Sequence, residues 1–453
     1  MAGTTFSEAM SRRPMRTFQW LTIAVCMLVL VCDGIDMQLL GIVAPLVIPD
    51  FGVDRGTFGI AMSAALVGFG IGAWGGGRLG DGVGRRYALA LAALIFALAT
   101  VGASQADGVW HMAAWRIVGG LGFGAAYANA IAMASEWLPE RLRPVMIATL
   151  SVGTPLGGTV VGALGPGLAA VYGWRGAFVV FGAATLVLVV IILLSLRDSP
   201  SFLLVKGKPD QAARAARLVL DDDVTLAPER HGVVDDAGMS VGVLHRTNTR
   251  FNTGVGIAFA ASALCAYGIL NWSTTFLTAH GFTLPQAGNA VSIGGIMAMI
   301  GSVLAGMLSR RFGTRIVMAV VSGTLFVNML ALGFAVQTLP AVPVLAERWL
   351  VVALLALAGA IFSAGMATMY IIMSTGYPQS CRSAGIGFGI FMSRVGAISA
   401  SGFGGWLLDI GHGSVVPFFA VLSVGAVLVS AGAFIVDRHV VGTRGASRAR
   451  TLG

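Results

Sequence analysis

The sequence has little charge for its length. Asp, Glu, Lys and Arg make up 11% of its 453 residues, whereas a typical soluble domain contains about 25% of them. Hydrophobic residues make up 56%. A soluble fold needs a charged surface around its core, so this composition excludes the ordinary soluble classes. We therefore predict a polytopic membrane protein.

Cysteine and histidine are also scarce. The four cysteines do not occur in CxxC spacing and the six histidines are scattered, so we expect neither a disulfide framework nor a metal site. No HExxH zinc motif and no GxxxxGK(S/T) phosphate-binding loop occurs. We therefore expect a protein that is not an enzyme and that uses no cofactor.

Long apolar runs are the main feature that is present. A run of about 20 apolar residues is long enough to cross a bilayer as a helix. We predict an all-α membrane protein with twelve such helices, near residues 18–48, 57–79, 87–105, 110–137, 144–172, 174–196, 252–279, 285–309, 314–337, 344–375, 383–408 and 415–436. They form two six-helix halves, 18–196 and 251–436, with tails at 1–17 and 437–453.

The arginines gather in alternate loops, and this pattern predicts the orientation. If every segment spans, one side contains Arg12, Arg13, Arg16, Arg85, Arg86, Arg141, Arg143, Arg310, Arg311, Arg315, Arg438, Arg444, Arg448 and Arg450. Arginine and lysine are enriched on the cytoplasmic side, which explains the net charge of +9 better than nucleic-acid binding does. We expect both termini to be cytoplasmic. We also expect a cytoplasmic linker at 197–250, with a short amphipathic helix at Gln211–Leu220 and no separate folded domain.

The first apolar run contains two acidic residues, in Cys32-Asp33-Gly34-Ile35-Asp36-Met37-Gln38. Each charge near the bilayer centre costs roughly 2.5–3.5 kcal/mol. Residues three apart lie on one side of a helix, so we expect Asp33 and Asp36 to face a protein interior or a water-filled path. Such residues mark ion or substrate pathways. The alternative is a pair of carboxylates neutralised by cations on other helices, with no role in transport.

The two halves contain related loops. Gly77 to Arg86 (GRLGDGVGRR) follows the second segment, and Gly306 to Arg315 (GMLSRRFGTR) follows the eighth, with Gly, Leu, Gly and Arg at matching offsets. Pro139 and Arg143, after the fourth segment, match Pro378 and Arg382, after the tenth. Internal repeats with a binding site at their interface are typical of secondary transporters.

The loop 77–86 resembles the signature loop of the major facilitator superfamily, glycine-x-leucine-x-aspartate-x-x-glycine-arginine-arginine. We expect its later glycines, Gly80, Gly82 and Gly84, to form a tight turn. The resemblance implies two pseudo-symmetric halves that alternate in access. It also implies a cytoplasmic gate that includes Gly77, Asp81, Gly84, Arg85, Arg86, Arg143 and Arg382.

The fourth segment contains an arginine followed by spaced glycines, in Trp115 to Gly124 (WRIVGGLGFG), which resembles a second superfamily motif. Arg116 needs an anion, and Asp33 and Asp36 are the candidates in the same half. A carboxyl pKa falls beside a cation and rises on desolvation, so such a carboxylate is suited to exchange a proton. Glu136, farther along the segment, has two interpretations: a proton-transfer group, or a salt-bridge partner of an arginine in the next loop.

Arg394, in the eleventh segment, has no acidic residue near it in the sequence. A guanidinium group can bind a carboxylate through two hydrogen bonds. We favour a role in binding an organic anion or in supporting its binding. The alternative is a charge partner for an Asp on another helix.

The first segment, with aspartate-glycine-x-aspartate followed by Gly41-Ile42-Val43-Ala44-Pro45, resembles the aromatic acid:proton symporter family of this superfamily. Asn271-Trp272 and Ser393 to Ala397 agree with it, so the resemblance covers both halves. It implies bacterial import of substrates such as benzoate, hydroxybenzoates, protocatechuate or hydroxyphenylpropionates together with a proton. We therefore expect a monomer in the inner membrane, working with protons and a small aromatic carboxylate.

An aromatic site needs flat apolar walls with a few polar groups. The candidate substrate-binding residues are Arg394, Asn271, Trp272, Tyr370, Gln38 and Tyr127, with Tyr267, Phe388 and Phe391 as further candidates. The candidate proton-coupling residues are Asp33, Asp36, Arg116 and Glu136. One rival is a symporter of another organic anion. Another is a proton-driven exporter. Many such exporters carry a signature in the fifth segment, and Gly153 to Gly158 resembles that signature only loosely. A receptor built on the same fold is a third.

Overall fold

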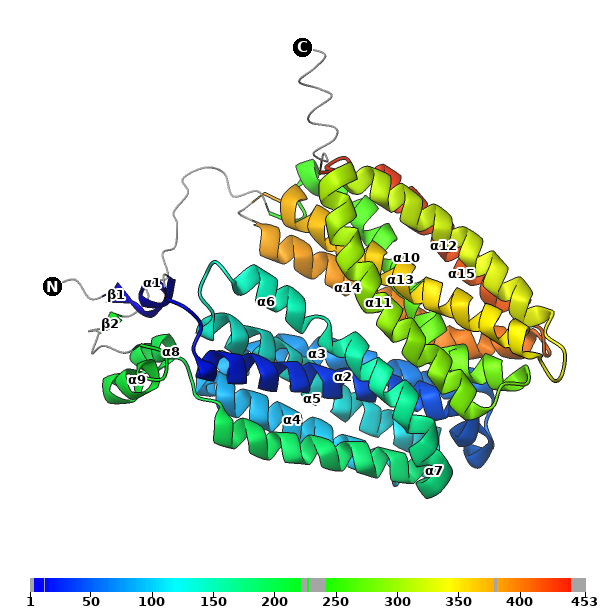
Figure 1. The fold of residues 1–453 in the computed structure, drawn as a ribbon, viewed down its shortest axis with the longest axis horizontal. Coiled ribbons are helices and arrows are strands. Elements are labelled where there is room, and N and C mark those ends of the chain that lie inside the picture. Colours follow the sequence, from blue (N-terminus) through cyan, green and yellow to red (C-terminus); the bar gives the residue numbers. More distant parts are fainter. Residues whose placement is uncertain (1–3, 12, 221–225, 228–241, 379–380, 441–453) are drawn as a thin grey trace, which may run out of the picture.

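The computed structural model describes residues 4–11, 13–220, 226–227, 242–378 and 381–440. Its long helices form two bundles that lie side by side (Figure 1). The first bundle contains α2 (Thr17–Phe51), α3 (Arg55–Val83), α4 (Arg85–Ala103), α5 (Val109–Trp137), α6 (Arg143–Leu150) and α7 (Gly153–Ser195). The second contains α10 (Thr249–Ala279), α11 (Leu284–Phe312), α12 (Thr314–Gln337), α13 (Leu345–Gly376), α14 (Arg382–Ile410) and α15 (Val416–Ile435).

The number of membrane crossings depends on α7. In the described part of the chain, eleven helices are long and apolar enough to cross a membrane. One of them, α7, has 43 residues and is non-helical at Gly173, with φ 70 and ψ 173. At about 1.5 Å per residue, each arm of α7 is long enough to span a bilayer. The two arms therefore give twelve crossings in total, which confirms the predicted fold.

The structure interrupts the segment that was expected to run unbroken over 144–172. α6 ends at Leu150, and Ser151 and Val152 form a turn before α7 begins. Pro155 explains the interruption, because proline has no N–H and its ring would clash with the carbonyl of Ser151 in a continuous helix.

The related loops of the two halves share a backbone conformation. Gly84, between α3 and α4, has φ 104 and ψ 147, and Gly313, between α11 and α12, has φ 88 and ψ 154. Residues with a side chain rarely adopt such angles. The expectation that Gly80 and Gly82 belong to the turn is wrong, because both lie inside α3; a Cβ at Gly80 would meet the side chain of Asn129 at 2.0 Å. We call the end of the bundles with these turns the inner end, and the opposite end the outer end.

The two bundles are joined toward the outer end and diverge toward the inner end (Figure 1). α7 packs against α11, and α3 packs against α14. The Ser292 hydroxyl donates to the Thr159 carbonyl at 2.7 Å, and the Gly56 N–H donates to Asp409 Oδ2 at 2.9 Å. These contacts leave the inner end as the side on which the halves are separated.

Glycines allow the backbones of the two halves to touch at the outer end. A Cβ at Gly59 would lie 2.2 Å from the Gly402 carbonyl oxygen, and a Cβ at Gly288 would lie 2.4 Å from the Gly162 carbonyl oxygen. No side chain fits at such distances. Small residues that bring helix backbones together are typical of membrane proteins.

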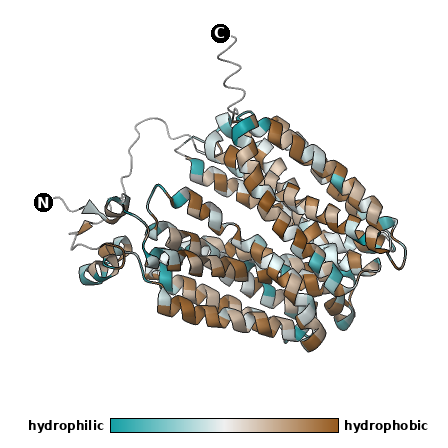
Figure 2. Ribbon diagram, in the orientation of Figure 1, coloured by the Kyte–Doolittle hydropathy of each residue, from teal (hydrophilic) through white to brown (hydrophobic). Residues whose placement is uncertain are grey.

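Hydrophobic residues cover the middle of the long helices, and hydrophilic residues are more frequent near their ends (Figure 2). Large side chains such as Val171, Leu194, Val303 and Phe334 are exposed on the helix surfaces. A surface of this kind is suited to lipid rather than to water.

Elements outside the spans pack on the inner end of the first bundle. They are α1 (Phe6–Ser11), α8 (Pro200–Val205), α9 (Pro209–Ala216) and the paired strands β1 (Thr4–Thr5) and β2 (Leu226–Ala227). Phe6 and Ala212 are buried in one hydrophobic cluster with Trp137 of α5. The helix expected at Gln211–Leu220 is α9, displaced toward the N-terminus. These elements share the core of the first half, whereas residues 221–225 and 228–241 of the linker and 441–453 of the tail lie outside the described residues.

Candidate functional site

Asp36 forms a buried ion pair. Its Oδ2 accepts a hydrogen bond from Arg116 Nη1 at 2.6 Å, and its Oδ1 accepts one from the Thr100 hydroxyl at 3.0 Å. Of the two anions expected for Arg116, the structure places Asp36 against it. Removing one partner of such a pair would leave an uncompensated buried charge. The pair therefore joins α2, α4 and α5.

Asp33 has a different environment. Its Oδ2 accepts a hydrogen bond from the Thr154 hydroxyl of α7 at 2.9 Å, and its Oδ1 is buried without a partner. Three residues along a helix correspond to about 60° of rotation, which is enough to turn Asp33 and Asp36 to different neighbours. Both carboxylates are buried in the protein, in agreement with the expectation that they face its interior, but they contact different helices. The free oxygen of Asp33 is available to bind a proton.

Arg394 of α14 lies over the ring of Phe69, with its guanidinium carbon 3.9 Å from the ring centroid. Its Nη1 donates to the Tyr267 hydroxyl at 3.2 Å, and its Nε has no partner. Asp33 and Tyr370 both lie within electrostatic range of its charge. No carboxylate contacts it in the described part of the chain, so a cation between the halves is available to an anion.

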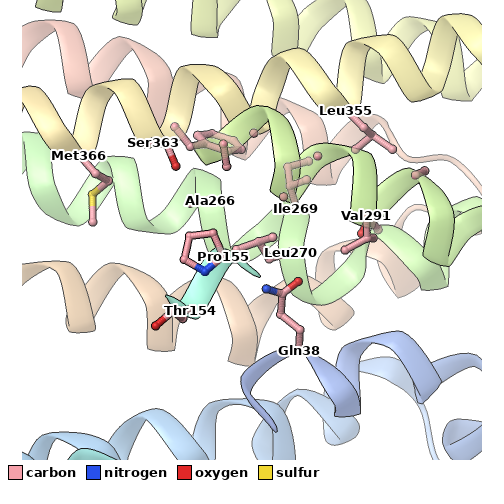
Figure 3. A pocket seen from close by; sticks show the side chains of 17 residues that line it. Gln38, Thr154, Pro155, Ala266, Ile269, Leu270, Val291, Leu355, Ser363 and Met366 are labelled. Atoms are coloured by element: carbon pink, nitrogen blue, oxygen red, sulfur yellow. The ribbon is translucent and has the colours of Figure 1, made fainter. Parts of the chain in front are cut away.

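A cavity of about 160 Å³ lies between the two halves (Figure 3) and is connected to Asp33 through Thr154. Thr154 connects the two features, because its side chain both lines the cavity and bonds to Asp33. Most of the wall is apolar and includes Pro155, Ile269, Leu270, Phe362 and Met366. A mostly apolar space with a few polar groups is typical of small-molecule sites.

Polar side chains interrupt this wall at a few places. Gln38, Ser273 and Ser363 line the cavity in addition to Thr154. Gln38 Oε1 and the Ser273 hydroxyl are buried without a hydrogen-bond partner. The amide of Gln38 extends from α2 toward the cavity (Figure 3). The cavity therefore contains unused hydrogen-bonding groups.

Asn271 and Trp272 are not among the residues that line the cavity. Asn271 Nδ2 donates to the Ser401 hydroxyl at 2.7 Å, and Trp272 Nε1 donates to the Ala400 carbonyl at 3.3 Å. Both side chains are buried and connect α10 to α14. In this conformation their polar atoms are occupied by helix packing.

Tyr370 and Tyr127 lie near Arg394, whose charge acts on both. Tyr370 packs edge-on against Phe259, with ring centroids 5.3 Å apart, and still exposes 41% of its surface. Tyr127 packs edge-on against Phe69, with centroids 5.9 Å apart. Two of the predicted aromatic residues therefore lie within electrostatic range of the cation.

Arg85 organises the inner end of the first half. It forms an ion pair with Asp81, one turn earlier, and its Nε lies 3.0 Å from Glu136 Oε1. The partner of Glu136 is thus Arg85 rather than Arg141 or Arg143. This cluster joins α3, α4 and α5 and leaves Glu136 at the rim rather than beside the cavity.

Three further predicted gate residues, Gly77, Gly84 and Arg86, lie around the same turn. The Gly77 carbonyl accepts a hydrogen bond from Arg85 Nη1 at 3.2 Å, and the backbone N–H of Arg86 donates to Asp198 Oδ1 at 2.9 Å. A Cβ at Gly84 would collide with the carboxylate of Asp198. Burial raises the pKa of Asp198, and the bond from Arg86 partly offsets this effect. Asp198 thereby fastens the start of the linker to the loop.

Arg143 and Arg382 occupy equivalent places in the two halves. Arg143 is the first residue of α6 and Arg382 the first of α14, and each has a buried Nε without a partner. Neither contacts the cavity. In the described ranges, no group of three His, Cys, Asp or Glu side chains is placed to hold a metal ion.

Four residues of the site are absent from the sequence-based candidates: Thr100, Thr154, Phe69 and Ser273. Thr100, Thr154 and Phe69 each contact a charged residue of another helix, and Ser273 lines the cavity. A hydroxyl or a ring within an apolar run gives only a weak sequence signal, because such residues are common in helix packing. The contacts become visible only when the helices are assembled.

Residues 26–346 match the family described as Major Facilitator Superfamily. The 4-hydroxybenzoate transporter PcaK of Pseudomonas aeruginosa is 28% identical over 88% of this chain and 88% of its own length. The benzoate transport protein of Acinetobacter baylyi is 26% identical over 93% of this chain and 90% of its own. Among solved structures, a D-xylose–proton symporter has the same fold, with a TM-score of 0.71, 17% identity, and coverage of 95% and 99%.

Proposed function

Because this chain belongs to the Major Facilitator Superfamily, we propose that it is a secondary transporter that imports an aromatic carboxylate together with a proton. The names of the 4-hydroxybenzoate and benzoate transporters support the substrate class. The distribution of arginines supports an inner end that faces the cytoplasm of a bacterium. The chain acts as a transporter and not as an enzyme.

The proposal depends on one observation: Asp33 has a free carboxylate oxygen, is connected to the apolar cavity through Thr154 and is within electrostatic range of Arg394. A carboxylate and a guanidinium on opposite halves can balance each other across the site. When a proton neutralises Asp33, Arg394 loses that counter-charge. The carboxylate of the substrate then replaces it, which couples substrate binding to proton binding.

The ion pair between Asp36 and Arg116 has a different role in this proposal. Asp36 already bonds to Arg116 and Thr100 through both oxygens. It therefore holds the helices around Asp33 in place and tunes the local field without releasing its own partner. The aromatic ring occupies the apolar cavity, and Tyr370 and Tyr127 border the carboxylate end.

The halves rock about this site. In the arrangement described above, they are joined at the outer end and separated at the inner end, which corresponds to a state open to the cytoplasm. The Asp81–Arg85–Glu136 cluster belongs to the surface that must meet the second half when the inner end closes. Its residues, together with Arg143 and Arg382, are the gate of the proposed cycle.

The test is uptake into proteoliposomes that contain the purified protein, with an imposed inward proton gradient. Radiolabelled aromatic acids are compared with a sugar and an amino acid, for wild type, Asp33→Asn and Asp33→Glu. We expect gradient-dependent accumulation of an aromatic acid in wild type, its loss in Asp33→Asn, and partial retention in Asp33→Glu.

Other outcomes have defined meanings. Accumulation that ignores both the gradient and Asp33→Asn would refute proton coupling and leave facilitated diffusion. Outward movement of substrate against inward proton flow would identify an exporter. Accumulation of a non-aromatic organic anion alone would replace the substrate class while keeping the mechanism.

A further inference from the structure

The amide of Gln38 and the hydroxyl of Ser273 are unusual among the polar groups of the cavity. Gln38 is 8% exposed and Ser273 is 1% exposed, and both line the cavity. Neither Gln38 Oε1 nor the Ser273 hydroxyl has a hydrogen-bond partner. Buried polar groups are nearly always paired, because an unpaired one loses its bonds to water without replacement. These two groups are therefore candidates for contact with a ligand.

The packing around Gln38 holds its amide in this position. A Cβ at Gly158 of α7 would lie 1.8 Å from Gln38 Nε2. The glycine thus leaves space for the amide against the helix backbone. An amide carries both a donor and an acceptor, so it can pair with a group that also has both. A hydroxyl group has this property.

The two groups lie at a distance from the charged part of the site. Along α2, Gln38 lies five residues beyond Asp33, and along α10, Ser273 lies six residues beyond Tyr267, the hydrogen-bond partner of Arg394. These separations correspond to rises of about 7.5 Å and about 9 Å toward the outer end. Both helices run in the same direction. The charged groups therefore lie closer to the inner end than Gln38 and Ser273, the neutral polar groups of the cavity wall.

We propose that Gln38 and Ser273 bind a ring hydroxyl remote from the carboxylate, so that the transporter selects hydroxylated aromatic acids over unsubstituted ones. The inference rests on the proposed function, because it takes the carboxylate to lie near Arg394. An aromatic acid with its hydroxyl opposite the carboxylate places polar groups at both ends of a flat apolar ring. This arrangement matches the order of groups from Arg394 toward the outer end, with the apolar cavity wall, Gln38 and Ser273 beyond the cation.

The test measures equilibrium binding of 4-hydroxybenzoate, 2-hydroxybenzoate and benzoate to the purified protein by isothermal titration calorimetry. We expect wild type to bind 4-hydroxybenzoate at least about tenfold more tightly than benzoate, a difference of about 1.4 kcal/mol. We expect 2-hydroxybenzoate to behave like benzoate, since its hydroxyl bonds to its own carboxylate. In Gln38→Leu the ratio of the two affinities should fall to near unity.

Ser273→Ala should reduce the preference by a smaller factor, and Ser322→Ala is its matched control. Ser322 is also buried, but its hydroxyl bonds to the Met318 carbonyl of its own helix. Gln38→Asn keeps the amide on a shorter side chain and should retain part of the preference. Size-exclusion elution identifies any variant that fails to fold, and the wild-type ratio together with Ser273→Ala then decides.

Equal binding of benzoate and 4-hydroxybenzoate by wild type would overturn the inference and leave the proposed function intact. So would an unchanged ratio in a folded Gln38→Leu protein. If no aromatic acid binds at all, the proposed function fails, and the inference fails with it.

Discussion

The two halves repeat a backbone but not its chemistry. The turns at Gly84 and Gly313 have nearly the same φ and ψ. Around the first turn, Asp81 and Arg85 form a cluster with Glu136. The equivalent positions around the second turn, three before and one after the glycine, are Arg310 and Thr314.

The same contrast occurs inside the membrane. The first half contains Asp33, Asp36 and Arg116, and the second contributes Arg394, which no carboxylate of the described ranges contacts. Both halves have the glycine that the turn requires, whereas their charged residues differ. We infer that the first half handles the proton and the second half handles the substrate anion. The following predictions test that division.

The largest effect is expected from breaking the ion pair of the first half. Arg116→Met or Asp36→Asn leaves one buried charge without its partner, which costs roughly 3–5 kcal/mol of folding stability. The double variant should recover much of this loss. Thermal unfolding of the detergent-purified protein measures it. Single variants as stable as wild type would show that the pair is not structural.

Loss of the cation of the second half should affect binding rather than stability. Arg394→Gln removes a charge-assisted contact to the substrate, which is worth about 1.5–3 kcal/mol, or up to about 100-fold in Kd. The unfolding temperature should change little, because no carboxylate contacts Arg394 in the described residues. Arg394→Lys should give an intermediate Kd, since it keeps the charge but not the fork of donors. A matched loss of stability and binding would place Arg394 with Arg116 as a structural residue.

Replacing the glycine of either turn should lower the stability of the protein. Gly84→Ala and Gly313→Ala each force a side chain into a positive-φ conformation, at a cost of about 1–3 kcal/mol. Gly84→Ala should be the more harmful, because its Cβ also meets Asp198. Chemical denaturation in mixed micelles compares the two variants. An unaffected Gly313→Ala would show that only the first turn is constrained.

The smallest effect is expected at the inner-end positions where the halves differ. Asp81 is mostly exposed in its ion pair with Arg85, and exposed pairs contribute about 0–1 kcal/mol. Asp81→Asn should therefore slow uptake by at most about fivefold. Arg310→Gln, at the equivalent position, should leave the uptake rate unchanged. Equal slowing of uptake in both variants would show that the inner ends of the two halves contribute equally to the gate.

The sequence predicts the helices well and their contacts poorly. The crossings follow from apolar length, and even the break at Gly173 falls where two predicted segments meet. The sides that the helices turn to one another are harder to predict, because a membrane helix is apolar toward both lipid and protein. Its periodicity therefore does not encode its rotation. For this reason the sequence left Arg116 with two possible anions, missed Thr154, and did not reveal that Asn271 and Trp272 bond to α14.

The backbone contacts of the outer end have a practical consequence. Where Gly59 meets Gly402 and Gly288 meets Gly162, the two halves touch through main chain, with no space for a methyl group on Gly59 or Gly288. Alanine in place of Gly59 or Gly288 would destabilise the conformation in which the outer end is closed. The population would then shift toward the conformation in which the outer end is open. Such a variant would let antibodies or inhibitors be raised against the conformation that is open at the outer end.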